Sequence, residues 1–380
     1  MGSNDYGRLG DGTITQRKTP VKVVDAGVTD VAAGWDWSSF RKADGRLWVM
    51  GRNQHGQLGD GTYVNRDDPV QVVESGVVSA AAGQHHTVFA KSDGSLWAMG
   101  SNAYGQFGSG DTSNPKRPVE VLPNGVAAAN PTKFAYVLKN DGSMLYHGGS
   151  VPAAYPEVYL PEGVLQVANP YLQLVYLKED GSLWRLRSNP RGTEQLVAGG
   201  VAVVASLRQR DHTLFIKEDG SLWASGDNPF GQLGDGTTTD REDPVQVVDA
   251  EVAAVFAGAY YGQGCSFFIK TDGSLWAMGY NHRGQLGDGT LENRHSPVKV
   301  VDSGVIDMAA DQGSAGQVET MIVKSDGSLW SVGSNEYGQL GDGTLENRAV
   351  WTKVLDAGAR GVTASSNSVF VFAEPNAAPT

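Results

Sequence analysis

The sequence predicts an all-β protein, a single β-propeller built from four-stranded blades. A segment of the DGSLW type recurs seven times, and each unit is about 40–50 residues long, the length of a four-stranded blade. The apolar runs between these segments are short, and none has the 3.6-residue period of an amphipathic helix. The copies begin at Asp44, Asp93, Asp141, Asp180, Asp219, Asp272 and Asp326.

Each unit has the same order of four expected strands. The DGS segment between the second and third strands is a tight turn, because Asp-Gly readily adopts the positive φ angles of such turns. A glycine-rich stretch joins the third strand to a fourth strand of Pro-x-x-Val type. In the second unit the strands are expected in GVVSAAAG (76–83), HTVFAK (86–91), LWAMG (96–100) and PVEVL (118–122).

The repeats divide the chain into seven complete units and one split unit, within one domain of residues 1–380. The start, MGSNDYGRLGDGT, matches VGSNEYGQLGDGT near the end, and GVTASSNSVFVFAEP (361–375) supplies only a first and a second strand. The count favours eight blades, with the termini pairing to remove open edges; a truncated piece of a longer repeat protein is the alternative. Complete units are expected at about 27–73, 76–122, 125–160, 163–197, 200–248, 251–301 and 304–355, and the split unit at 1–24 plus 358–375.

The combined pattern AAG-x-x-HT, DGSLW, GxNxxGQLGDGT and PxxV resembles the regulator-of-chromosome-condensation repeat family, in its bacterial type. Residues 84–108, QHHTVFAKSDGSLWAMGSNAYGQFG, carry the pattern well. The resemblance implies a propeller most often of seven blades, so both seven and eight stay open. Guanine-nucleotide exchange, the activity of the founding member, ranks last, because no unit has a long inserted wedge loop and there is no basic tail.

Composition narrows the classes of partner. The net charge is −12 and the sequence pI is near 5, and no basic stripe is visible, which argues against nucleic acid. No apolar run of about 18 residues would span a membrane. No signal peptide is visible, the compartment is open, and we expect a monomer. Cys265, the single cysteine, excludes internal disulfides.

Residues that repeat are interpreted as framework. The third-strand tryptophans pack between blades, and His86, His212 and Cys265 share one framework position. His55, His282 and His295 are expected to be solvated in peripheral loops. The GDGT aspartates are interpreted as turn residues in preference to calcium ligands, since each copy has only one carboxylate; they are Asp11, Asp60, Asp235, Asp288 and Asp342.

The loops between first and second strands do not repeat, and we expect them to surround one mouth of the central channel and to bind a ligand. They are rich in aromatic residues and in charges of both signs, as protein interfaces are. Their candidate binding residues are Trp35, Asp36, Trp37, His85, Lys133, Tyr171, Arg208, Arg210, Asp211, Tyr260, Tyr261, Asp311 and Glu319. Two short units lack GQLGDGT, which predicts a groove flanked by Tyr155, Tyr159, Tyr171 and Arg191.

The first hypothesis is therefore a binding propeller that holds a protein or a glycan at this mouth. The alternative is an enzyme at the same place. A metal-assisted hydrolase would use a divalent metal on ligands chosen from Asp36, His85, Asp211, Asp311 and Glu319. A polysaccharide lyase would need a base beside a cationic residue. Its candidates are His85, Asp211, Arg208, Arg210, Tyr260 and Tyr261.

Overall fold

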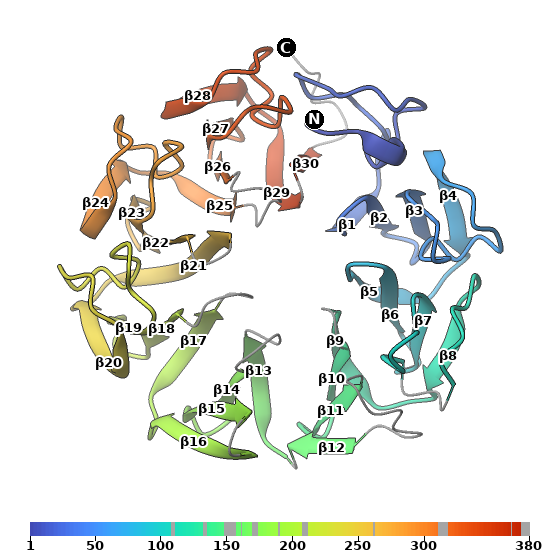
Figure 1. Cartoon of the computed structure of the whole chain (residues 1–380), viewed down its shortest axis with the longest axis horizontal. Helices are drawn as coiled ribbons and strands as arrows, with labels where there is room; N and C mark the ends of the chain where they lie inside the picture. The colour runs from blue at the N-terminus through green and yellow to red at the C-terminus, as the bar shows by residue number, and fades with distance from the viewer. Residues whose placement is uncertain are drawn as a thin grey trace. The chain divides into compact units, whose positions relative to one another are not determined.

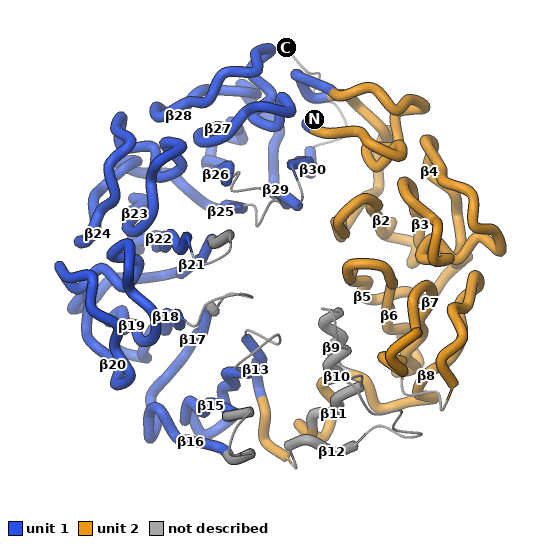
Figure 2. The backbone as a smooth tube through the Cα atoms, viewed as in Figure 1, with its two compact units in different colours: residues 1–2, 17–20, 165–380 blue, residues 3–16, 21–164 orange. Residues whose placement is uncertain are grey.

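A computed structural model of the chain consists of antiparallel β-sheets joined by loops (Figure 1). Apart from one 3-10 turn, η1 (Asp5–Gly7), every element is a strand. The structure describes residues 1–107, 111–131, 135–147, 157–160, 162–168, 174–188, 191–206, 212–260, 263–310, 318–365 and 367–373. These residues form two compact units, which Figure 2 colours separately.

Unit 2, residues 3–16 and 21–164, holds three four-stranded sheets. In each sheet the strands follow one another in sequence order, each antiparallel to the next. The first two sheets are β1 (Val28–Ala33), β2 (Trp37–Lys42), β3 (Leu47–Gly51), β4 (Arg66–Val73), β5 (Val77–Ala82), β6 (His86–Lys91), β7 (Leu96–Gly100) and β8 (Val119–Leu122). The third is β9 (Val126–Pro131), β10 (Ala135–Lys139), β11 (Met144–His147) and β12 (Glu157–Leu160).

Unit 1, residues 1–2, 17–20 and 165–380, holds four more four-stranded sheets and one two-stranded sheet. The first two are β13 (Val164–Ala168), β14 (Val175–Lys178), β15 (Leu183–Ser188), β16 (Arg191–Val197), β17 (Val201–Ser206), β18 (His212–Lys217), β19 (Leu222–Gly226) and β20 (Arg241–Val248). The next two are β21 (Val252–Tyr260), β22 (Gln263–Lys270), β23 (Leu275–Gly279), β24 (Arg294–Val301), β25 (Val305–Ala310), β26 (Glu319–Lys324), β27 (Leu329–Gly333) and β28 (Arg348–Leu355). The two-stranded sheet is β29 (Ala359–Ser365) with β30 (Ser368–Ala373).

The predicted fold class, an all-β propeller with four-stranded blades, is confirmed. The third strands carry the repeated tryptophans, whose indoles stack on a second-strand aromatic ring, as Trp97 does on Phe89 at 6.3 Å. The indole Nε1 of Trp97 donates to Ser95 of the DGS turn at 2.9 Å. These tryptophans therefore belong to the blade core, as predicted. The single-domain organisation of residues 1–380 stays a prediction.

One framework position links the second strand to the glycine that ends the third strand. His86 pairs with Gly100 and His212 with Gly226, and Cys265 pairs with Gly279 in the same register. All three side chains are buried. Burial also raises the pKa of the Cys265 thiol to about 12, so the thiol stays protonated and inert at neutral pH. We call this place the histidine position.

Consecutive blades are joined by a hydroxyl next to the histidine position. Thr87, Ser266 and Thr320 each donate through the side-chain oxygen to a glutamine backbone carbonyl of the preceding blade. The acceptors are Gln57, Gln232 and Gln285, at 2.6, 2.8 and 2.9 Å. The same junction therefore recurs in both units.

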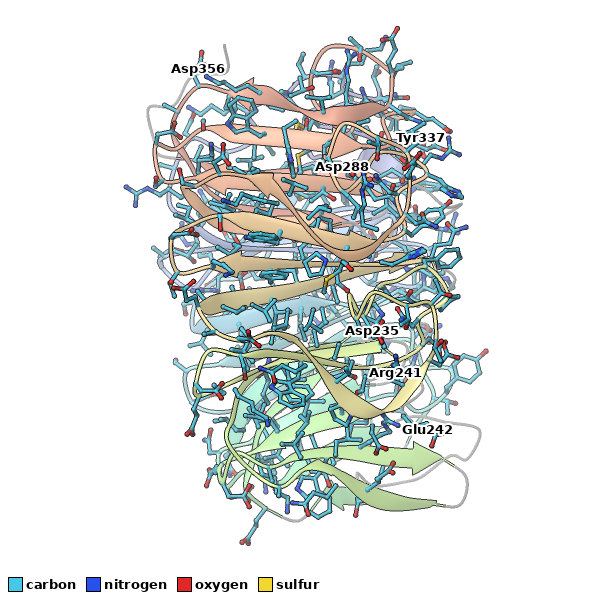
Figure 3. All side chains as sticks on the ribbon, turned by 90° about the vertical axis from the view of Figure 1, so that its left-hand side faces the viewer. Asp235, Arg241, Glu242, Asp288, Tyr337 and Asp356 are labelled. Carbon is cyan, nitrogen blue, oxygen red and sulfur yellow. The ribbon has the colours of Figure 1, made fainter. Side chains whose placement is uncertain are left out.

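The loops of unit 1 leave the sheets on two faces. In Figure 3, Asp235 and Tyr337, from the loops between third and fourth strands, lie on the right-hand side. Asp356, which follows β28, lies on the left. Because strand direction alternates, the loops between first and second strands leave on the side of Asp235 and Tyr337.

Candidate functional site

Five of the thirteen predicted binding residues have described side chains. Trp35, Asp36 and His85 lie in loops between first and second strands, whereas Trp37 and Glu319 begin β2 and β26. Tyr260 ends β21, Tyr159 lies in β12 and Arg191 begins β16. The remaining predicted residues lie outside the described part of the chain: Lys133, Tyr155, Tyr171, Arg208, Arg210, Asp211, Tyr261 and Asp311.

Trp37 and Glu319 occupy the histidine position. Trp37 pairs with Gly51 and Glu319 with Gly333, in the register of His86 with Gly100. Both side chains have 0% exposure. Trp37 packs under Gly34 within the core of its blade and presents no surface to a ligand.

The described residues that do meet surround Asp36 in unit 2. Arg8 donates to Asp36 at 2.8 Å and to the Trp35 carbonyl at 2.7 Å. Arg52, at the end of β3, donates to the other Asp36 oxygen at 3.0 Å and lies over the Tyr6 ring at 5.0 Å. One carboxylate thus holds two guanidinium groups from different loops, which fixes the loop that carries Trp35.

Two histidines extend this group. The His85 ring lies 4.7 Å from the His55 ring and 6.0 Å from the Trp35 ring. The Trp35 indole is 45% exposed, the largest aromatic surface of the group. We call these residues the Trp35 cluster: Tyr6, Arg8, Trp35, Asp36, Arg52, Gln54, His55 and His85. The prediction that His55 is simply solvated is wrong, because the His85 ring covers it; His282 and His295 are exposed as expected.

Both cluster histidines are neutral at pH 7. Burial lowers the pKa of His55, and the nearby Arg52 charge lowers it further. Burial also lowers the pKa of His85, assisted by His55 and Arg52 and opposed by Asp36. Charge in the cluster is therefore carried by the arginines and by the Asp5 and Asp36 carboxylates, and the aromatic surface beside them is uncharged.

The backbone at Tyr6 is unusual and has a local cause. Gln57 accepts a hydrogen bond from the backbone N–H of His55, and Gln106, Gln232, Gln285 and Gln339 do the same in their loops. Arg8 stands at this glutamine position in the first loop, and its side chain turns toward Asp36. Tyr6 there adopts φ 63°, a left-handed conformation that costs a non-glycine residue about 1–2 kcal/mol.

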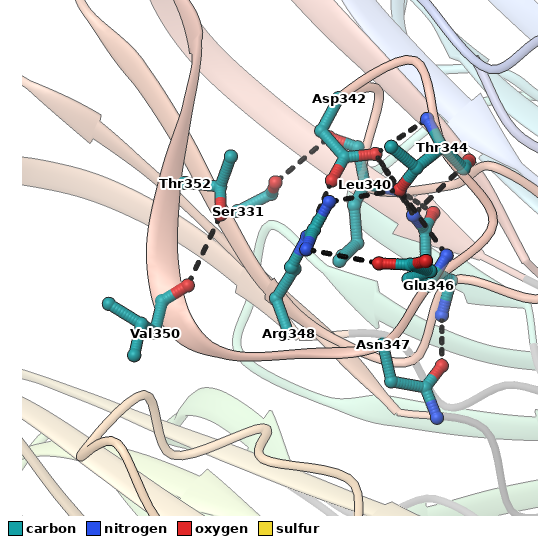
Figure 4. A network of polar contacts seen from close by, with 10 residues as sticks. Ser331, Leu340, Asp342, Thr344, Glu346, Asn347, Arg348, Val350 and Thr352 are labelled. Carbon is teal, nitrogen blue, oxygen red and sulfur yellow. Dashed lines mark hydrogen bonds and ion pairs between the residues drawn. The ribbon is translucent and has the colours of Figure 1, made fainter.

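The GDGT aspartates are structural. Asp342 accepts from Asn335 at 3.0 Å, from Thr344 at 2.7 Å and from Arg348 at 2.8 Å (Figure 4). Burial alone would raise the pKa of Asp342, but the hydrogen bonds from Thr344 and Arg348 outweigh it and lower the pKa. Asp60, Asp235 and Asp288 have the same threonine and arginine partners. The interpretation as turn residues therefore has a specific hydrogen-bonding basis.

The predicted metal ligands do not assemble among the described residues. Asp36 binds two arginines, and Glu319 lies in the core at the histidine position of another unit. Within the described ranges no three His, Cys, Asp or Glu side chains lie close enough together to hold a metal ion. No described helix is long and apolar enough to cross a membrane.

Sequence reasoning missed Tyr6, Arg8, Arg52 and His55 because they lie in loops interpreted as repeated framework. Two of them nevertheless carry a signal. Arg8 replaces the glutamine of the other GQLG or GQFG segments, and Arg52 replaces the serine found at Ser3, Ser101 and Ser334. Comparing the repeats position by position in these loops would have singled out both arginines.

Comparisons with known proteins agree with the repeat pattern. Two models of the regulator of chromosome condensation (RCC1) repeat match the chain. The first matches residues 1–40, 44–90, 272–312 and 326–366. The second matches residues 28–57, 77–106 and 210–232, and together they cover more than half of the sequence.

The curated relatives match over limited stretches. The mouse E3 ubiquitin-protein ligase HERC2 is 27% identical over 197 residues, which is 48% of this chain and 4% of HERC2. The ultraviolet-B receptor UVR8 of Arabidopsis thaliana is 32% identical over 123 residues, 32% of this chain and 27% of the receptor. The chain therefore spans only a small part of these relatives.

Solved structures match over almost the whole chain. Human WBSCR16 superposes with a TM-score of 0.65 at 18% identity, covering 98% of both chains. Prp20p of Saccharomyces cerevisiae, studied for its binding to Gsp1p and histones, gives a TM-score of 0.66 at 16% identity, covering 98% of this chain and 90% of Prp20p. At this level of identity the likeness shows the fold.

Proposed function

Because the chain belongs to the regulator of chromosome condensation (RCC1) repeat family, we propose that it is a binding propeller whose Trp35 cluster contacts a protein partner. One observation carries the proposal. The half-exposed Trp35 indole sits on a loop held by two arginines that depart from the repeat, and these arginines add no contact that the framework needs elsewhere.

The backbone at Tyr6 supports a binding role. In the other loops a glutamine side chain satisfies the backbone N–H at the equivalent position without a left-handed residue. At Tyr6 the chain accepts about 1–2 kcal/mol of conformational cost, and the Tyr6 ring comes to lie against Arg52. Strain of this kind is characteristic of sites that hold side chains ready for a ligand.

The chemistry of the cluster favours a protein partner. Tryptophan, tyrosine and arginine dominate the binding energy of protein interfaces, where partly buried aromatic rings anchor the contact. Arg52 is partly exposed beside Trp35, so the cluster offers an apolar anchor next to a cation. The yeast propeller of the same fold binds Gsp1p and histones, which are proteins. The glycan alternative would use the Trp35 face for stacking without needing the arginines.

The scaffold that we propose for this role has eight blades, one of them split. Gly2 bridges Ser368, and the backbone of Met1 exchanges hydrogen bonds with Val369. The two parts of the split unit thus pair within unit 1, in the way that third strands pair with second strands elsewhere. The bacterial origin suggested by the regular DGSLW units stays a prediction.

The experiment uses variants that restore the repeat. R8Q and R52S introduce the residue that other units carry, and W35A removes the exposed indole. Tyr63→Ala, which removes an aromatic ring that is 51% exposed outside the cluster, is the matched control. A partner captured by the wild type and identified by mass spectrometry is then titrated against each variant with purified proteins.

We expect W35A and R52S to weaken the purified partner by at least about tenfold, the equivalent of 1.4 kcal/mol, and Y63A to leave its affinity unchanged. Equal affinity of all the variants would refute the cluster as the contact site. Binding of W35A-sensitive glycans on an array, with R8Q and R52S unaffected, would replace the protein partner by a carbohydrate.

A further inference from the structure

The two-stranded sheet of unit 1 has a free edge at β30. In the four-stranded sheets the second strand is covered by a third strand along its whole length, and five or six of its residues are buried, as in β6, β18 and β26. In β30 only Ser368 and Val369 are buried, Phe370 to Phe372 are partly exposed, and Ala373 is exposed. Among the described residues, β30 pairs with β29 and, at Ser368 and Val369, with the first two residues of the chain.

The register shows which positions of a third strand are filled. Ser368 faces Gly2 as His86 faces Gly100, so Met1 and Gly2 correspond to Met99 and Gly100. The residues that would correspond to Ala98, Trp97 and Leu96 have no counterpart opposite Phe370, Val371 and Phe372. The open segment therefore begins directly beyond Met1 and extends along β30.

The hydrogen-bonding groups along this edge follow from the same register. Met1 and Val369 exchange both backbone hydrogen bonds, N–H to C=O in each direction. In an antiparallel pair such residues alternate with residues that bond to the opposite side. The N–H and C=O groups of Val371 and Ala373 therefore point away from β29, toward the open edge, and form a template for another strand.

The side chains along the edge indicate what would cover it. In the intact blades the third-strand leucine is fully buried, and the tryptophan stacks over the second strand. Val371 stands where Phe89 meets Trp97, and it packs against the cluster of Val362, Val369 and Leu355 with its outer side uncovered. An aromatic residue opposite Val371 and a leucine opposite Phe372 would complete this cluster.

We propose that the edge of β30 is a peptide-binding site, which accepts an extended strand of a partner chain bearing a Leu-Trp pair followed by a small residue. Strand addition of this kind gains affinity from main-chain hydrogen bonds and specificity from alternate side chains. The described Leu-Trp strands of this chain are all paired within their own sheets, so the added strand comes from another polypeptide. This site lies in unit 1 and is independent of the Trp35 cluster in unit 2.

The test uses the repeat's own third strand as the probe. A fluorescein-labelled, N-terminally blocked peptide SDGSLWA, the sequence of residues 92–98, is titrated against the full chain by anisotropy. SDGSLSA, in which serine replaces tryptophan, is the matched control peptide. We expect saturable binding of SDGSLWA, affinity at least about tenfold weaker for SDGSLSA, and a Tm raised by about 2–4 °C in excess SDGSLWA.

The variant V371P removes the outward N–H and leaves the pairing of β30 with β29 intact, because proline is tolerated at the free side of an edge strand. V371P with an unchanged circular dichroism spectrum is expected to lose peptide binding. If V371P does not fold, A373P, which alters the exposed end of the same edge, takes its place. No saturable binding to the wild type, or equal binding to the folded proline variant, would overturn the proposal.

Discussion

His212 tests whether the histidine position is framework or chemistry. Its ring is fully buried, with Nε2 at 3.1 Å from the Ser266 hydroxyl, and this burial lowers its pKa to about 4. An unfolded histidine titrates near pH 6.5. The folded pKa is the lower of the two, so the stability from the neutral ring is complete above pH 6.5 and is lost as the pH falls toward 4.

The magnitude follows from these two values. Between pH 7 and pH 5 the unfolded chain takes up nearly one proton at His212, and the folded chain takes up almost none. The free energy of unfolding should therefore fall by about 2 kcal/mol through this residue alone. The natural substitute is cysteine, which Cys265 provides at the same position of the next blade. A buried thiol is neutral at both pH values, so the contribution disappears in H212C.

Urea unfolding of wild type and H212C at pH 7 and pH 5 measures the difference. Any packing loss in H212C is the same at both pH values and cancels when the two changes are subtracted. The wild type should lose about 2 kcal/mol more than H212C between pH 7 and pH 5. Equal losses in the two proteins would refute the assignment of His212 as a buried, neutral framework residue.

Two further substitutions test the framework beneath the site. D342N removes the charge that Arg348 and Thr344 bind, and urea unfolding should show a loss of about 1.5–3 kcal/mol, against less than about 1 kcal/mol for D356N on the exposed Lys353 pair; equal losses would contradict the structural role of Asp342. G51A places a Cβ 2.6 Å from the Asp36 carbonyl at φ 104°, whereas G105A meets nothing within 4 Å. G51A should therefore lower stability by about 2 kcal/mol more than G105A, and similar melting curves would refute this steric argument.

Much of the fold could be predicted because its signals are local. The DGS turns, the Leu-Trp strands and the Pro-x-x-Val strands each follow from residues close together in sequence. The shared position of His86, His212 and Cys265 could also be aligned by eye, and the strand register bears it out. Trp37 and Glu319 occupy the same position, but their residue types hid this, because neither resembles a histidine.

The candidate site was predicted only in part because it depends on contacts between successive units. Trp35, Asp36 and His85 lie in the variable loops that sequence comparison singled out. Arg8 and His55 reach them from the preceding unit's loop between third and fourth strands, 28 and 30 residues earlier for Asp36 and His85. Spacing along the chain cannot show such a contact, since it arises from how one blade packs on the next.

The hydroxyl-to-carbonyl junction between blades has an evolutionary consequence. Thr87, Ser266 and Thr320 make the same bond to the preceding blade, and the acceptor is a backbone carbonyl, which every residue possesses. A duplicated blade would therefore find a compatible neighbour on either side without any compensating change. Gene duplication could lengthen or shorten the array one repeat at a time, and the two identical DGSLWAMG segments are what a recent copying event would leave behind.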